Sequence, residues 1–236
     1  MLFLSIMIAL IPGFAWLFFY LQEDTHPEPK ATVAKVFIAG GASAFVALAV
    51  QVALQHIGFS FSSDSIASSA DITARVAVSI VLFAFVEELV KFSAAYATMN
   101  QDPAFKEPID AMIYMVVAAL GFATIENIGA VHGNFSSYTG NLLAGAVFET
   151  VTFRFVGATL LHTLSSALLG YYWALHIRNF GDSRPLFWGI ALATVLHAVF
   201  NYLIITYGNL IFAVAFLSMI GFFVLGDFEK LKSRPV

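Results

Sequence analysis

Long apolar runs, separated by short polar segments, occupy most of this 236-residue chain. A helix of ~20 apolar residues crosses the hydrocarbon of a bilayer, and inside lipid the backbone must satisfy its own hydrogen bonds. We therefore expect an all-α fold, a polytopic membrane helix bundle with about seven transmembrane helices. The expected spans are Met1–Leu21, Val33–Ile57, Ile72–Met99, Ile109–Ala130, Phe155–His176, Pro185–Thr206 and Leu210–Gly226.

The composition of the chain supports this interpretation and excludes several function classes. Charged residues make up 11% of the chain and hydrophobic residues 60%, whereas a soluble domain has roughly 25% charged residues. The chain has no cysteine, which excludes thiolate catalysis, disulfide bonds and cysteine-ligated zinc. We expect one integral-membrane domain over residues 1–236, with the lipid bilayer as a partner and no nucleic acid. The first span lacks a basic leader and an A-x-A-like cleavage site, so we expect it to be retained.

The segment Leu142–His176 is too long for one simple span, because ~20 residues cross the hydrocarbon. We expect it to divide near Thr152, with the span proper at Phe155–His176. The preceding piece, Leu142–Thr152, is predicted to be a short interfacial helix, a re-entrant helix or part of a span.

Basic residues occur in alternate loops. Apart from Arg75, which lies near the second loop, they are Lys30 and Lys35, then Lys106, then Arg178 and Arg184, and finally Lys230, Lys232 and Arg234 in the tail. With seven spans, all of these segments fall on the same side of the membrane. Because basic loops stay in the cytoplasm, the pattern predicts an external N-terminus and a cytoplasmic C-terminus.

Three ionisable residues, Glu87, Glu88 and Lys91, interrupt the third span. Each costs roughly 2.5–3.5 kcal/mol at the centre of a membrane helix, so such residues are paired, line a cavity or serve a function. Lys91 lies one helical turn from both carboxylates but can neutralise only one of them. We expect Glu87 to act as a catalytic base supported by Glu88 and Lys91, with the reverse assignment left open. The alternative is a structural ion pair between helices.

Further polar residues lie inside or beside the later spans. They are Glu126 and Asn127 in the fourth, Arg154 near the predicted division, His162 in the fifth, and His197 and Asn201 in the sixth. A rise of ~1.5 Å per residue places the carboxylates and histidines ~9–20 Å below the external ends of their helices. We therefore expect Glu87, Glu126, His162 and His197 to share one site between the midplane and the external side.

Two glutamates and two histidines can activate water. A carboxylate takes a proton from water, while imidazoles stabilise the developing oxyanion and Asn201 adds a donor. Zinc is an alternative, held by His162, His197 and Glu87. No H-E-x-x-H motif is present, and the ammonium of Lys91 competes with a cation for the nearby carboxylates. We therefore expect a metal-free site with no cofactor.

Four motifs in this order resemble those of the PrsW family of bacterial intramembrane proteases. They are Glu87-Glu88-x-x-Lys91, Gly121-Phe-Ala-Thr-Ile-Glu126-Asn127, Arg154 with His162, and His197-x-x-x-Asn201. The related CAAX prenyl endopeptidases carry E-E-x-x-x-R, which this chain lacks. The motifs extend over more than half of the chain, and the motif-bearing core covers about residues 72–206.

The resemblance implies a single integral-membrane protease domain in a bacterial cell (inner) membrane. It implies an endopeptidase, of glutamic or metallo type, that cuts a single-pass or membrane-anchored protein. The family's namesake implies an anti-sigma factor as substrate, in a site-1-type cleavage that releases a stress response. The resemblance assigns catalytic roles to Glu87, Glu88, Glu126, His162 and His197, and supporting roles to Lys91, Asn127, Arg154 and Asn201.

Two other functions remain open from the sequence. A non-catalytic membrane scaffold of the same fold would keep polar helix residues without cutting a substrate. A proton-coupled transporter would use intramembrane glutamates and histidines as a proton relay. Such transporters often contain inverted repeats, and no internal repeat is evident in this chain.

Overall fold

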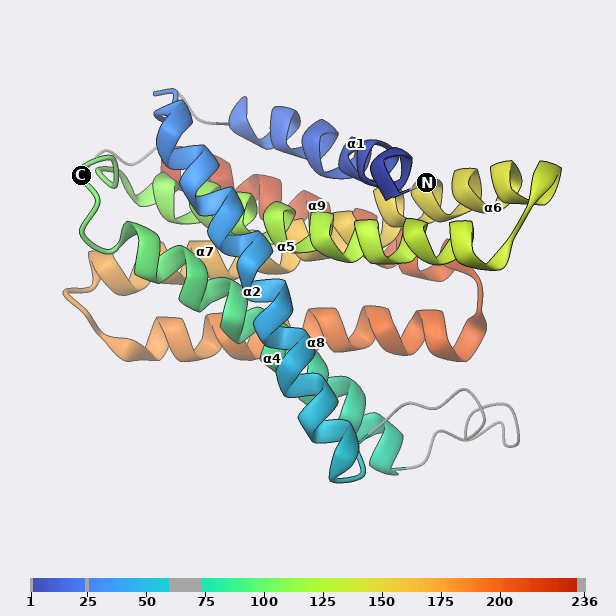
Figure 1. Ribbon diagram of the computed structural model, residues 1–236. Coiled ribbons are helices and arrows are strands. Elements are labelled where there is room, and N and C mark those ends of the chain that lie inside the picture. Colours follow the sequence, from blue (N-terminus) through green and yellow to red (C-terminus); the bar gives the residue numbers. More distant parts are fainter. Residues whose placement is uncertain (1, 24–25, 60–73, 233–236) are drawn as a thin grey trace.

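The computed structural model describes residues 2–23, 26–59 and 74–232, and every regular element within them is helical (Figure 1). The predicted all-α bundle is confirmed. The elements are α1 Leu2–Leu21, α2 Lys30–His56, α4 Ala74–Met99, α5 Pro108–Ser137, α6 Gly140–Phe153, the π-helical turn η1 Arg154–Ala158, α7 Thr159–Arg178, α8 Ser183–Tyr207 and α9 Leu210–Lys232. Most of the expected second loop, Gly58–Asp71, lies outside the described residues.

Helix α5 is the centre of the bundle. In its most apolar stretch 89% of the residues are buried, and it packs against α1, α2, α4, α6, α7 and α9. A helix that is apolar on all sides is expected to be enclosed by others, and its long buried run of small and branched residues fits that position. The functional side chains on α5 are therefore held by neighbours on several sides.

Glycines allow α2 to cross α5 at very short range. A Cβ atom on Gly40 would overlap the backbone of Ala118, and a Cβ atom on Gly121 would overlap the backbone of Phe37. The glycines of α2 and α5 thus allow close helix contact, as small residues do in membrane bundles. This crossing brings the later part of α2 toward the charged middle of α4.

Five helices among the described residues are long and apolar enough to cross a membrane: α2, α5, the combined helix over 142–178, α8 and α9. Residues Ile6–Leu21 of α1 form a shorter apolar helix. Helix α4 falls outside this set because Glu87, Glu88 and Lys91 lie in its middle. The chain is therefore an integral membrane protein, and α4 carries three ionisable residues of the candidate site in its middle.

The predicted division of Leu142–His176 near Thr152 is wrong. Helices α6 and α7 form one helix, joined by the π-helical turn η1. Helix α6 packs along the end of α5, where Asn134 Nδ2 donates to Thr150 Oγ1 at 2.7 Å. α5 itself continues to Ser137 instead of ending at Ala130. The partner helix stabilises both extensions, so neither segment needs to break at the expected membrane boundary.

The basic segments gather at one end of the bundle. The connections α1–α2, α4–α5 and α7–α8 and the end of α9 all lie at the left in Figure 1. Lys35 Nζ pairs with Asp102 Oδ2 at 3.2 Å, and Lys232 Nζ pairs with Glu23 Oε2 at 2.7 Å. The arrangement of the helices therefore matches the alternation of basic loops in the sequence.

Candidate active site

Helix α4 presents Glu88 and Lys91 to the interior of the bundle, and both side chains are fully buried. Lys91 Nζ donates to Glu88 Oε1 at 2.6 Å, one helical turn away. Lys91 therefore neutralises Glu88, and Glu87, which lies about 100° around the helix, is not its direct partner. Lys91 Nζ also lies 5.3 Å from the centre of the Phe122 ring.

The Glu88 carboxylate contacts side chains from three helices, α4, α7 and α8. Besides Lys91, its carboxylate accepts hydrogen bonds from Ser165 Oγ at 2.9 Å and Ser166 Oγ at 3.4 Å on α7. His197 Nδ1 on α8 lies 2.7 Å from Glu88 Oε1. A buried carboxylate is tolerated when its oxygens are this fully satisfied. The contact with Glu88 also fixes the orientation of the His197 ring.

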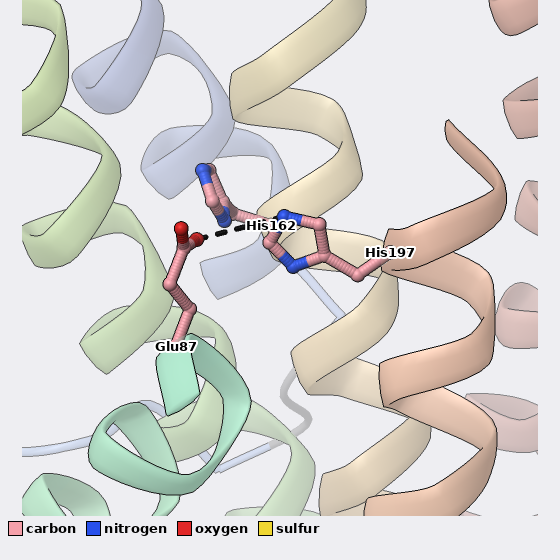
Figure 2. Close-up of side chains that lie close together, drawn as sticks. All are labelled: Glu87, His162 and His197. Carbon is pink, nitrogen blue, oxygen red and sulfur yellow. Dashed lines mark ion pairs between the residues drawn. The ribbon is translucent and has the colours of Figure 1, made fainter. Parts of the chain in front are cut away.

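Glu87 differs from its neighbour because one of its oxygens has no hydrogen-bond partner. Oε1 accepts a hydrogen bond from Gln51 Nε2 on α2 at 2.8 Å. Oε2 is buried and unpartnered among the described residues, and it lies 3.5 Å from His197 Nε2. Figure 2 shows Glu87, His162 and His197 pointing toward one another from α4, α7 and α8. The free oxygen of Glu87 therefore faces two imidazoles.

His162 connects the α4 carboxylates with Glu126. Its Nδ1 lies 3.1 Å from Lys91 Nζ, and its Nε2 lies 2.9 Å from Glu126 Oε2. The ring packs edge-to-face on His197, with ring centres 5.2 Å apart, and against Phe122 at 5.4 Å. Glu87, Glu126, His162 and His197 thus converge as expected, through contacts that cross α4, α5, α7 and α8.

The π-helical turn η1 begins at Arg154, whose side chain points into the bundle. Arg154 Nη2 donates to Glu126 Oε2 at 2.8 Å, and its Nε donates to Asn127 Oδ1. Asn127 Nδ2 in turn donates to Thr159 Oγ1 at 3.2 Å. Single π-helical turns often occur at functional sites, and this one places a guanidinium beside Glu126. The Glu126 side chain is 32% exposed, which makes it the most accessible carboxylate of the cluster.

Two residues differ from the sequence expectation. Asn201 is half-buried on α8, and among the described residues it makes no side-chain hydrogen bond to the cluster. Gln51, which the sequence analysis did not single out, touches Glu87 directly. A glutamine well inside the second predicted span was the available signal, because polar side chains in membrane helices are costly without a partner.

The donor atoms of Glu87, His162 and His197 could hold a metal ion. One ligand atom from each lies within 4.8 Å of the others, and all three residues are buried. Two imidazoles and one carboxylate match a known catalytic zinc set. Glu87 Oε2 has no hydrogen-bond partner among the described residues, so it could bind an ion. The contact between His197 Nδ1 and Glu88 orients the imidazole, as outer carboxylates do for histidines that bind metals. The residues therefore fit zinc in type and proximity.

Together, the helices and the buried cluster define a class: a polytopic membrane protein whose interior gathers carboxylates and imidazoles that can activate water. Comparison with known proteins then identifies the family. Residues 28–226 match the family described as "PrsW family intramembrane metalloprotease". The chain belongs to the PrsW family and is a membrane protease of that family.

Individual relatives agree with this assignment. The chain is 29% identical to Protease PrsW of Geobacillus kaustophilus over 196 residues, which cover 82% of this chain and 76% of the relative. It is 26% identical to Protease PrsW of Clostridioides difficile, covering 84% and 78%. Protease PrsW of Bacillus subtilis is 24% identical over 98% of this chain and 97% of its own length. No solved structure is significantly similar to this chain.

Proposed function

We propose that this chain is an endopeptidase that hydrolyses a peptide bond of a membrane-anchored protein, with Glu87 as the base that activates water. The observation that carries the proposal is the buried, unpartnered Oε2 of Glu87 facing His197 and His162. A base must lie within hydrogen-bond reach of the proton that it takes. A water molecule between Glu87 Oε2 and His197 Nε2 would meet this requirement.

In the proposed reaction, Glu87 takes a proton from water as the oxygen attacks the peptide carbonyl. His197 stabilises the oxyanion that forms, which is the role of fixed donors in acyl transfer, and His162 lies beside it with both ring nitrogens held by Lys91 and Glu126. Glu87 then delivers its proton to the leaving amine. Glu88 and Lys91 act as positioning residues. Glu88 holds the imidazole of His197, and Lys91 contacts Glu88 and the imidazole of His162.

The charges of the cluster support a site that works without a metal ion. It contains the carboxylates of Glu87, Glu88 and Glu126 and the basic side chains of Lys91 and Arg154. Three negative charges against two positive ones leave one negative charge, which one additional proton on the Glu87–His197 pair neutralises. A divalent ion would instead leave a net positive charge, which is unfavourable in a low-dielectric interior.

Zinc remains the second candidate because the family description includes "metalloprotease" and the donor set fits. Glu87, His162 and His197 would hold the ion, which would supply Lewis acidity and a more acidic water. Both ring nitrogens of His162 already have partners, Lys91 and Glu126, so His162 would have to release one of them. We therefore favour the metal-free site.

The position of the cluster along its helices supports a proposal for the orientation of the protein and the side of cleavage. Its residues lie ~18–27 Å along their helices from the basic end, beyond the middle of a ~30 Å hydrocarbon layer. We propose that the basic end is cytoplasmic and that cleavage occurs toward the external side of a bacterial cell membrane. A membrane-anchored regulator such as an anti-sigma factor would be cut there.

The test uses purified protein in liposomes together with membrane proteins from cells lacking it. New peptide termini are identified by mass spectrometry, after exhaustive chelation and with elemental analysis of the same sample. We expect new termini near the external ends of single-span proteins, unaffected by chelation. The absence of any new terminus would favour the scaffold alternative. Activity lost on chelation and restored by stoichiometric zinc would refute the metal-free site.

A further inference from the structure

The π-helical turn η1 deprives one backbone carbonyl of its usual donor. In an α-helix the Phe155 carbonyl would accept a hydrogen bond from the N–H group of Thr159, four residues later. In η1 the Thr159 N–H donates instead to the carbonyl of Arg154. A backbone carbonyl inside a membrane bundle is costly without a donor. The π-helical form is therefore stable only if another group donates to Phe155.

Trp16 of α1 supplies this donor. Its indole Nε1 donates to the Phe155 carbonyl oxygen at 2.9 Å. The indole also stacks on the Phe155 ring, with ring centres 5.3 Å apart and an angle of 23° between the ring planes. The Trp16 side chain therefore holds both the backbone and the side chain of one residue in the turn.

Helix α1 lies along α5, close enough to place Trp16 at the turn (Figure 1). A Cβ atom on Gly13, one turn before Trp16, would lie 2.5 Å from Thr124 Oγ1 on α5. Asn127 Nδ2, one turn later on α5, donates to the Ala9 carbonyl oxygen at 3.5 Å. Helix α1 thus packs against the part of α5 that belongs to the candidate active site.

The turn brings Arg154 and His162 to the same face of one long helix. His162 follows Arg154 by eight residues, which in an uninterrupted α-helix would place the two side chains about 80° apart. An i→i+5 turn takes up one additional residue, which reduces this angle to about 20°. Both side chains contact the same atom, Glu126 Oε2, at 2.8 and 2.9 Å. This shared contact therefore depends on the π-helical form of η1.

We propose that Trp16 is a positioning residue of the candidate active site. By donating to the Phe155 carbonyl it holds η1 in the π-helical form, and it thereby keeps Arg154 against Glu126. This inference rests on the proposed peptidase function. Trp16 precedes residues 28–226, which match the family, so α1 contributes to the site from outside the matched region.

Arginine modification tests the contact without any measurement of cleavage. Phenylglyoxal reacts with accessible guanidinium groups, and mass spectrometry gives the modified fraction of each arginine in the full chain in liposomes. Trp16→Phe keeps an aromatic ring and removes the donor. We expect it to raise the modification of Arg154 roughly two- to tenfold and to leave that of Arg178, at the basic end, unchanged. The control is Trp188→Phe, which changes an exposed tryptophan on α8 and should alter neither.

A double-mutant cycle shows whether Trp16 acts through Arg154. In the active protein, Trp16→Phe should lower kcat roughly two- to tenfold. KM should change little, because the substitution alters a contact of Glu126 and not the binding of the substrate. In the Arg154→Gln background, the same substitution should have no further effect. If Arg154→Gln does not fold, the modification of Arg154 in the single variant decides the proposal.

Two outcomes would overturn the proposal. Unchanged modification of Arg154 in Trp16→Phe would do so whether or not the protein cleaves a substrate. Equal losses of kcat in both backgrounds would show that Trp16 acts on general stability instead. Increased modification of Arg154, together with no cleavage by the wild-type protein, would contradict the peptidase proposal and leave the link between Trp16 and Arg154 standing.

Discussion

Two adjacent glutamates on one helix have opposite environments. Glu88 is enclosed by an ammonium, two hydroxyls and an imidazole, so its negative charge is fully matched. Glu87 has one amide partner, Gln51, and one free oxygen. A residue whose partners are complete is suited to hold its neighbours in place. A residue with a free oxygen is suited to exchange a proton with a ligand.

Lys91→Met should strongly destabilise the protein, because Glu88 would remain as a buried carboxylate without its cation. Breaking a buried ion pair from one side costs roughly 3–5 kcal/mol. The double variant Glu88→Gln with Lys91→Met removes both charges and should recover much of this loss. Thermal unfolding of the purified variants in one detergent measures the effect. A double variant less stable than Lys91→Met would contradict the assigned pairing.

Gln51→Leu should slow cleavage and also lower the stability of the protein, because it leaves Glu87 Oε1 buried without its hydrogen-bond donor. A hydrogen bond to a charged group contributes about 1.5–3 kcal/mol, and a factor of ten in rate corresponds to 1.36 kcal/mol. We therefore expect a reduction of roughly ten- to a hundredfold in kcat/KM if Gln51 positions Glu87. Gln55→Leu, one turn later on the exposed face of α2, is the control. Equal effects of both variants would show that the contact with Glu87 is irrelevant.

At the level of the helices, the sequence predicted more about the elements than about their joints. Apolar runs located the spans, and the fourth span, expected from Ile109, begins at Pro108 as α5. A division was expected near Thr152, but the chain stays helical there, because the π-helical turn at Arg154–Ala158 connects α6 and α7 without a break. The contact between Gln51 and Glu87 was missed because it depends on how α2 crosses α4. The sequence therefore predicts which polar residues matter, but the partner of each one depends on how the helices pack.

The α2–α5 crossing gives a direct test of the packing. Gly121→Ala places a Cβ atom against the backbone of α2 at Phe37 and Gly41, which cannot move aside as a side chain would. We expect a loss of about 1–3 kcal/mol in unfolding free energy. Gly129→Ala, on the same helix, meets no atom within 4 Å and should be neutral or stabilising. Two variants of equal stability would contradict the close crossing.

At the scale of the whole molecule, a basic end and an opposite end define its orientation. Ion pairs such as Lys35–Asp102 and Lys232–Glu23 tie the basic connections together. The sequence predicted this alternation because charge and hydropathy act over whole segments and do not depend on exact contacts. The fold of the motif-bearing region was therefore predictable. The position of α6 beside α5 was not, because it depends on pairing between two helices.

Reporter fusions test the orientation in cells. A reporter after the tail, or between Arg178 and Arg184, should be cytoplasmic, because basic segments are retained there. A reporter at Ser136–Ser137, at the end of α5, should be external. The accessibility of a single introduced cysteine at each position gives an independent readout, since the chain has none of its own. A cytoplasmic reporter at Ser136 would overturn the seven-span arrangement.

The central claim is that Glu87 is the catalytic base, and its most direct test is the rate of peptide-bond cleavage by Glu87→Gln. The amide keeps the shape of the side chain and removes the base. With purified proteins of equal helical content in the same liposomes, we predict a loss of at least roughly a hundredfold, the usual contribution of a general base. The variant should remain folded and inserted. Near-normal cleavage by Glu87→Gln would contradict the account, and loss of cleavage by a folded Glu88→Gln would then transfer the role of base to Glu88.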